Sequence, residues 1–208
     1  MIKTDVLIVG GGPAGLGAAI ETTTRGLKTI LVDENPKIGG QLIKQTHKFF
    51  GAYSHFAGTR GINIHRKLLA ESDHEYLDLR TETTIAGYFD DDIIGIYERE
   101  KNLFSKVDAE KIIIATGASE KIIPFKRNDI PGVYGAGGVQ TLMNVFGVLP
   151  GKKILMIGAG NIAAHHIRAW RQTGRAEVVG VCRRDAEKAK TFAKEMETDW
   201  TTDYHNFF

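Results

Sequence analysis

Apolar residues recur along this chain in short unbroken runs rather than in strict alternation with polar residues. Four such runs lie within the segments at residues 5–9, 28–32, 111–115 and 154–157. Runs of this length are typical of strands that are buried on both faces, as in parallel sheets. Between the first two runs, small residues occur at helical spacing up to Gly26, which is placed to end a helix. The pattern therefore predicts a strand–helix–strand unit of about 30 residues.

Residues 83–107 show a different pattern. Three short segments rich in β-branched and aromatic residues lie at residues 85–89, 93–97 and 103–107. Polar triplets separate them, the first being Asp90-Asp91-Asp92. Short strands with polar turns at this spacing predict a small antiparallel meander. We interpret the three adjacent carboxylates as a solvated turn rather than a metal site, and no metal site is predicted.

The succession of elements predicts an α/β fold: a Rossmann-like nucleotide-binding domain with a small β meander, followed by a partial second Rossmann-like unit. We expect the first domain at residues 1–118, itself incomplete, and a connecting segment at residues 119–150. Pro150 and Gly151 mark a boundary before the second unit, residues 151–208. A further helix is predicted around residues 65–72.

A glycine fingerprint follows the first apolar run and opens the first helix. In Gly10-x-Gly12-x-x-Gly15, the three glycines permit a tight turn, close approach of a pyrophosphate and close helix–strand packing, in that order. Pro13 and Ala14 begin the helix, whose free N–H groups and partial positive charge favour a phosphate. This arrangement of strand, turn and helix predicts a dinucleotide site.

An acidic residue is expected at the end of the second strand, where it would accept hydrogen bonds from a ribose. Asp33 stands there, about 20 residues after the fingerprint, with Glu34 as the substitute. The alternative is a glycine turn that only packs tightly. The strand, the helix, the spacing and the acid together favour nucleotide binding.

A second fingerprint follows the last apolar run. Gly158, Gly160, Asn161 and Ile162 make the turn and open a helix, and Ala163 stands in place of the third glycine. This context again predicts a dinucleotide site. The predicted unit that contains this helix has about half the length of a dinucleotide domain.

Two arginines, Arg183 and Arg184, stand at the end of the following strand, where an acid would select NAD. A guanidinium at this place suits the 2′-phosphate of NADP. We therefore favour NADP over NAD, although Asp185 could serve NAD. The alternative is a solvated turn in which Asp185 caps the next helix.

Composition limits the remaining function classes. The formal net charge of +2 gives no reason to expect a nucleic acid or a membrane as partner. The single cysteine, Cys182, excludes an internal disulfide and a CxxC redox pair. No run of roughly 18 apolar residues and no signal-peptide pattern is found in the sequence. We therefore expect a cytoplasmic protein, and no catalytic residue can be assigned.

Two segments resemble flavin motifs of the two-dinucleotide flavoproteins. Gly40 and Gln41 belong to a Gly-Gly segment, and Ala115, Thr116 and Gly117 end a strand in the same way as the second flavin motif. The resemblance implies that these residues bind FAD. Longer matches at residues 39–51 and 129–140 resemble the FAD-dependent pyridine nucleotide-disulfide-reductase-like group, and within it the flavin subunits related to sarcosine oxidase alpha and opine oxidase. This resemblance covers roughly residues 1–157.

The C-terminal part resembles a different family. Residues 163–170, 176–195 and 202–204 are similar to the opening of the glucose-fructose oxidoreductase/inositol dehydrogenase type of NAD(P)-dependent enzyme. The chain is therefore open to interpretation as a junction of two families, whether an engineered chimera, a natural recombinant or an assembly error.

The resemblance implies an FAD-binding oxidoreductase, or the flavin subunit of one, that passes hydride between flavin and a nicotinamide or amine-type substrate. Its partners would be a small-molecule substrate and other subunits of a heteromeric oxidase or dehydrogenase, or further copies in a homo-oligomer. Two alternatives stay open: a non-catalytic nucleotide-binding fragment, and a fragment of an NADP-dependent dehydrogenase without flavin.

Overall fold

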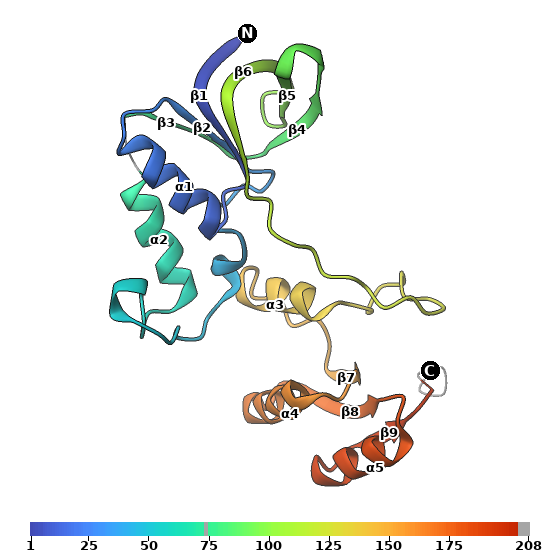
Figure 1. Ribbon diagram of the computed structural model, residues 1–208. Coiled ribbons are helices and arrows are strands. Elements are labelled where there is room, and N and C mark those ends of the chain that lie inside the picture. Colours follow the sequence, from blue (N-terminus) through green and yellow to red (C-terminus); the bar gives the residue numbers. More distant parts are fainter. Residues whose placement is uncertain (73–74, 204–208) are drawn as a thin grey trace. The chain divides into compact units, whose positions relative to one another are not determined.

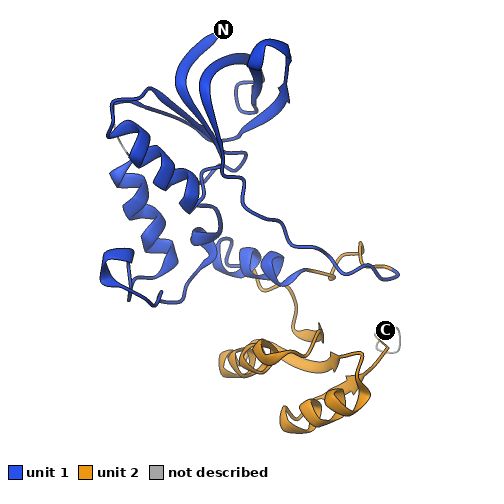
Figure 2. Cartoon of the chain, viewed as in Figure 1, with its two compact units in different colours: residues 1–126, 135–147 blue, residues 127–134, 148–208 orange. Residues whose placement is uncertain are grey.

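A computed structural model describes residues 1–72 and 75–203 (Figure 1). The chain forms two compact units (Figure 2). The larger unit comprises Met1–Lys126 and Gly135–Gly147, and the smaller comprises Arg127–Tyr134 and Val148–Phe208. Within the described residues, the larger unit carries a six-stranded mixed sheet and the smaller a three-stranded sheet. The predicted α/β class is confirmed.

The larger sheet has a parallel half built from the first apolar runs. Its strand order is β3-β2-β1-β6-β5-β4. The parallel strands and the first helix are β1 (Ile2–Val9), α1 (Pro13–Thr23), β2 (Thr29–Val32) and β3 (Leu77–Arg80). Strand β1 pairs in parallel with β2 on one side and with β6 on the other. The predicted strand–helix–strand unit is present, and β3 is an addition for which the sequence offered no strong pattern.

The meander forms the antiparallel half of the same sheet. It consists of β4 (Thr83–Tyr88), β5 (Ile93–Glu98) and β6 (Leu103–Ile114). The sequence predicted separate strands at residues 103–107 and 111–115, and this was wrong. A single strand passes from its antiparallel pairing with β5 into its parallel pairing with β1, and the polar residues between the two runs stay extended because Asp108 and Ala109 still pair with β1.

The two faces of β1 explain its unbroken apolar run. Val6 and Ile8 point toward the α1 side and pack with Leu16. Leu7 points to the opposite face, where it packs with the meander residue Ile96. Successive side chains of a strand alternate between faces, so a strand covered on both sides needs apolar residues throughout. Complete burial of each large aliphatic side chain contributes roughly 1.5–3 kcal/mol.

Shorter elements complete the larger unit. They are the 3-10 turns η1 (Gly40–Lys44), η2 (Tyr53–His55) and η3 (Asp90–Asp92) and the helices α2 (Gly61–Glu71) and α3 (Ala136–Asn144). The helix predicted at residues 65–72 is the later part of α2. Helix α3 lies in the segment that the sequence predicted as a connection. The acidic triplet forms η3, in which Asp91 and Asp92 have positive φ angles and Tyr88 donates its hydroxyl proton to Asp92.

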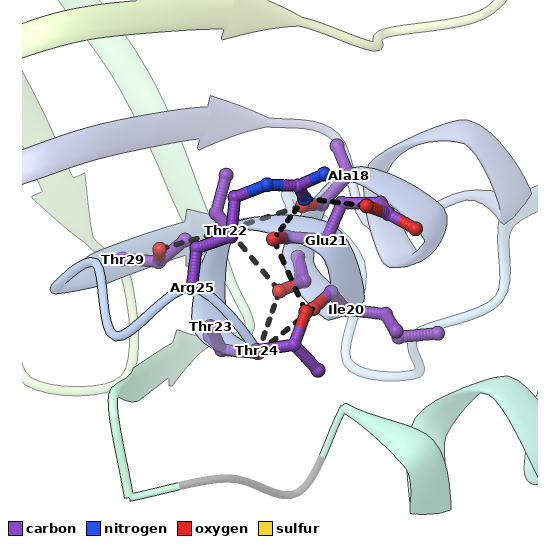
Figure 3. Close-up of polar contacts among 9 residues, drawn as sticks. Ala18, Ile20, Glu21, Thr22, Thr23, Thr24, Arg25 and Thr29 are labelled. Atoms are coloured by element: carbon purple, nitrogen blue, oxygen red, sulfur yellow. Dashed lines mark hydrogen bonds and ion pairs between the residues drawn. The ribbon is translucent and has the colours of Figure 1, made fainter.

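Three threonine hydroxyls form hydrogen bonds at the C-terminal end of helix α1 (Figure 3). Thr22, Thr23 and Thr24 each donate to the carbonyl four residues earlier, at 3.0, 2.7 and 2.7 Å. The Ile20 carbonyl also accepts the backbone N–H of Thr24, so the threonine hydroxyls add side-chain bonds to carbonyls that lie inside the last turns of the helix. Thr29 of β2 donates in turn to the Thr22 hydroxyl at 2.9 Å, which ties the end of the helix to the start of the next strand.

The smaller unit repeats the parallel pattern. Its elements are β7 (Lys153–Ile157), α4 (Asn161–Thr173), β8 (Glu177–Cys182), α5 (Ala186–Glu195) and β9 (Asp199–Thr201). The strands are parallel in the order β7-β8-β9, and Ile167, Val181 and Met196 lie in their core. Across the part of the chain that the structure describes, no helix is long and apolar enough to cross a membrane.

Candidate nucleotide-binding site

The first fingerprint glycines lie at close contacts that exclude a side chain. Gly10 has φ +106°, and a Cβ there would lie 2.4 Å from the carbonyl oxygen of Ala115. A Cβ on Gly15 would lie 1.8 Å from the carbonyl oxygen of Gly10. Backbone cannot yield by such amounts without moving a strand or a helix. The turn therefore packs against the end of β6 and against α1, as the fingerprint predicts.

Helix α1 begins with its N-terminus free of side-chain caps. Gly12 is its N-cap in extended conformation, Pro13 occupies the first turn, and that turn holds no acidic side chain. The first N–H groups of a helix have no intrahelical acceptor, and the helix dipole adds partial positive charge there. Ala14 is exposed. The end of α1 thus offers backbone donors of the kind that bind phosphate.

The two acidic residues after β2 have different surroundings. Asp33 is only 7% exposed. Its Oδ2 accepts from the Gly11 N–H at 2.7 Å, and its Oδ1 accepts from the backbone and side-chain nitrogens of Asn35 at 2.8 and 2.9 Å. Both carboxylate oxygens therefore hold the protein's own turns together. Glu34 is exposed, and its backbone carbonyl accepts from Arg99.

A second loop lies against the first fingerprint. The Gly39 N–H donates to the carbonyl of Gly11 at 2.8 Å. Gly40 has φ +51°, and a Cβ there would lie 2.8 Å from the Cα of Gly12. Gln41 follows on η1 with its side chain exposed. The structure thus brings the Gly-Gly segment beside the start of α1.

The end of β6 supplies a third segment. Ala115 donates its N–H to the carbonyl of Val9 at 2.8 Å, so the chain leaves the sheet directly beside the fingerprint turn. Thr116 and Gly117 are exposed, and Gly117 has φ +71°. Three segments that are distant in sequence therefore meet at the carboxyl ends of the parallel strands, which is where open α/β sheets bind ligands.

The second fingerprint forms a comparable turn in the smaller unit. Gly158 has φ +104° and donates its N–H to the carbonyl of Cys182 at 2.9 Å. Gly160 is the extended N-cap of α4, and Asn161 opens that helix. Ile162 is 64% exposed, whereas Ala163 is buried in the place of the third glycine.

The two adjacent arginines do different things. Arg183 donates from Nη1 to the carbonyl of Ala159 at 2.7 Å, so its guanidinium is held on the glycine turn. Arg184 is exposed. Asp185 caps α5 by accepting from the Lys188 N–H at 3.0 Å, and this bond, with a further bond to the Lys188 side chain, lowers the pKa of Asp185. The capping role foreseen as the alternative for Asp185 is present.

Two surface hollows lie away from these turns. One of about 540 Å³ is lined by the amino ends of β1, β2 and β3, including Lys3, Lys28 and Asp78. Ligands of open α/β sheets bind at the opposite, carboxyl ends. In residues 1–72 and 75–203, no group of three His, Cys, Asp or Glu side chains is placed to hold a metal ion.

This geometry defines a Rossmann-type nucleotide-binding protein. The profile of the pyridine nucleotide-disulphide oxidoreductase family matches residues 4–205, which include the C-terminal segment. The chain belongs to this family of FAD-dependent oxidoreductases. The comparisons do not show the resemblance to glucose-fructose oxidoreductase. Tyr204, which was part of that resemblance, lies outside the described residues.

Curated relatives include the sarcosine oxidase subunit alpha of Rhizobium meliloti, 32% identical over 71% of this chain and 16% of the relative. The hydrogen cyanide synthase subunit HcnB of Pseudomonas protegens is 30% identical over 76% of this chain and 34% of the relative. The chain thus spans about a sixth to a third of the length of these relatives.

Among solved structures, the L-proline dehydrogenase of P. horikoshii superposes with a TM-score of 0.72 at 27% identity, covering 85% of this chain and 35% of that one. The thioredoxin reductase of Lactococcus lactis superposes with a TM-score of 0.65 at 21% identity, covering 95% of this chain and 64% of the reductase. The second likeness concerns the fold alone.

Sequence reasoning missed one group of contacts near the site. Glu120 accepts hydrogen bonds from the N-terminus of α3, and Asn144 at the other end of α3 donates to Lys44 of η1. No motif or periodicity predicts these contacts, because they join residues that are 16 to 100 positions apart.

Proposed function

We propose that this chain forms the FAD-binding part of a flavin-dependent oxidoreductase. The observation that carries the proposal is the close approach of Gly10 to Ala115, of Gly15 to Gly10 and of Gly40 to Gly12. A Cβ added to Gly10, Gly15 or Gly40 would strike backbone at these contacts. Such contacts bring the ends of three segments together beside the N-terminus of α1. We call this arrangement of the fingerprint turn, the Gly39-Gly40 segment and the Ala115-Thr116-Gly117 segment the cradle. The cradle and the family membership both support FAD as the cofactor. Bound FAD would supply hydride transfer, and the protein would supply binding and orientation.

Individual roles follow from the surroundings of each residue. We assign the pyrophosphate to the backbone of Gly12, Ala14 and Gly15 at the start of α1. We assign the ribose to Glu34 rather than to Asp33, because the Asp33 carboxylate is buried and accepts from Gly11 and Asn35, whereas Glu34 is exposed. This reverses the order of preference drawn from the sequence.

The remaining flavin contacts come from the other two segments. Gly40 and Gln41 would lie along the ribose and pyrophosphate, and Ala115, Thr116 and Gly117 beside the same cofactor. The positions of these residues next to the fingerprint support the assignment.

For the second fingerprint we propose a nicotinamide dinucleotide, with NADP favoured over NAD. Gly158, Gly160, Asn161 and Ile162 would approach the pyrophosphate. Arg184 is the arginine that would meet the 2′-phosphate, because the guanidinium of Arg183 is held by the Ala159 carbonyl. Asp185 is engaged as a helix cap, which argues against its use as the ribose acid of an NAD site.

Substrate and partners are proposed from the names of the relatives. Sarcosine oxidase, opine oxidase and L-proline dehydrogenase are named for amine or amino-acid substrates, so we propose an amine-type substrate here. Several relatives are named as subunits, which favours further subunits or a homo-oligomer as partners. A cytoplasmic location stays a prediction from the sequence.

A visible absorption spectrum of the purified chain tests the proposal, followed by anaerobic addition of NADPH or NADH. Flavin bands that bleach with NADPH support both proposed sites. Flavin bands that persist after NADPH addition would support the alternative of an FAD-binding fragment that does not transfer hydride. A colourless protein that takes up no added FAD refutes the flavin proposal, and NADPH binding by such a protein would favour the NADP-dependent dehydrogenase alternative.

A further inference from the structure

A carboxylate from another segment of the chain caps the N-terminus of helix α3. The two oxygens of Glu120 accept from the N–H groups of Ala136 at 2.9 Å and Gly137 at 3.0 Å. Glu120 lies three residues after Gly117, on the chain that leaves β6. A carboxylate on the free N–H groups of a helix forms charge-assisted hydrogen bonds and also meets the positive end of the dipole. The bonds join α3 to the end of the Ala-Thr-Gly segment.

The position before the helix leaves room for this carboxylate. Gly135 is the N-cap of α3, and a Cβ there would lie 2.2 Å from Oε2 of Glu120. Its φ of −68° is one that any residue can adopt, so backbone conformation does not require glycine. The space is needed by the Glu120 side chain. Gly138 in the same helix has open space around its Cβ position.

The other end of α3 is fastened to the Gly-Gly segment. Asn144, the last residue of the helix, donates from Nδ2 to the carbonyl of Lys44 at 2.7 Å. Lys44 ends η1, which begins with Gly40 and carries Gln41. Figure 1 shows α3 next to this turn. One nine-residue helix therefore connects two of the three segments that form the cradle.

We propose that α3 is a brace of the flavin cradle, with Glu120 and Asn144 as positioning residues. The inference rests on the proposed FAD site. Without α3, FAD itself would have to order the segments after Ala115 and around Gly40. The free-energy cost of that ordering would make FAD binding weaker. Neither residue is expected to touch the flavin. Both residues are at the surface, so their loss should change FAD binding more than global stability.

A double-variant cycle tests the brace through the FAD dissociation constant and the visible circular dichroism of the bound flavin. Glu120→Gln replaces one acceptor oxygen by an NH2 group, which cannot accept a hydrogen bond, and removes the charge. Gly135→Ala displaces the carboxylate without altering it. Each is expected to weaken FAD binding by about fivefold or more. The double variant should be no weaker than either single one, because both remove the same contact. Asn144→Ala should weaken binding as well.

Three matched controls accompany the cycle. Gly138→Ala adds the same methyl group to α3 in open space, Glu110→Gln removes an exposed carboxylate of β6, and Asn63→Ala removes an exposed amide of α2. These should bind FAD as the unaltered chain does. Additive losses in the cycle, or Gly138→Ala as weak as Gly135→Ala, overturn the brace. So does unchanged FAD binding by Glu120→Gln. An unaltered chain that binds no FAD overturns the proposed function itself.

Discussion

The contact between Gly40 and Gly12 offers a sharp test of the cradle, through the substitution Gly40→Ala. The new Cβ would lie 2.8 Å from the Cα of Gly12, which is 0.6 Å inside the 3.4 Å at which ordinary contact begins. Overpacking of this kind costs typically about 1–3 kcal/mol. The φ of +51° adds roughly 1–2 kcal/mol for a residue that carries a Cβ. We expect Gly40→Ala to lower the free energy of unfolding by about 2–5 kcal/mol.

A matched substitution separates the steric cost from the conformational one. Gly58 has φ +79° and belongs to the same unit, but its Cβ position has nothing within 4 Å. Gly58→Ala should therefore cost only the conformational part, about 1–2 kcal/mol. Urea unfolding of both variants gives the two free energies, and titration with FAD followed by quenching of flavin fluorescence gives the two affinities.

The affinities carry the functional part of the prediction. Relief of the overlap must move η1 away from the start of α1, so Gly40→Ala should weaken FAD binding by at least about tenfold, or 1.4 kcal/mol. Gly58→Ala should leave the affinity unchanged. If the two variants prove equal in stability and in FAD affinity, the close approach of Gly40 to Gly12 is not part of the site.

Three further predictions concern neighbouring pairs of residues and one histidine. Asp33→Asn should lower the free energy of unfolding in urea by about 1–3 kcal/mol. Glu34→Ala should leave that free energy unchanged and weaken FAD binding. The reverse pattern would show that Asp33, not Glu34, binds the ribose. Arg184→Ala should remove the preference for NADPH over NADH in a binding titration, while Arg183→Ala should lower stability; an unchanged preference in Arg184→Ala would refute the assignment. Burial and the nearby Arg66 lower the pKa of His65 from its ordinary value of 6.5. The unfolded state therefore takes up this proton first as pH falls, and the free energy of unfolding decreases below the unfolded-state pKa. His65→Gln should flatten this decrease in urea unfolding at a series of pH values, and an equal slope in both proteins would contradict the prediction.

Local patterns account for much of the architecture. The apolar runs predicted β1, β2 and β7, and the structure places strands there. The helix predicted after the first glycine fingerprint is α1, Pro13–Thr23. These predictions succeed because burial on both faces and helical periodicity leave direct traces in the order of residues. Strand β6 was divided in the prediction because Asp108 and Glu110 interrupt its apolar run while its backbone stays paired.

The site divides in the same way. The sequence alone determined where the glycine turns lie, because only glycine fits where backbone meets backbone, as at Gly15. It ranked Asp33 before Glu34 by position along the chain alone and did not separate Arg183 from Arg184, since no local pattern records which of two neighbouring side chains binds the protein's own turns. Only the tertiary structure showed that Asp33 and Arg183 bind the glycine turns and that α3 lies between two distant segments, because contacts of long sequence separation depend on packing that no local pattern records.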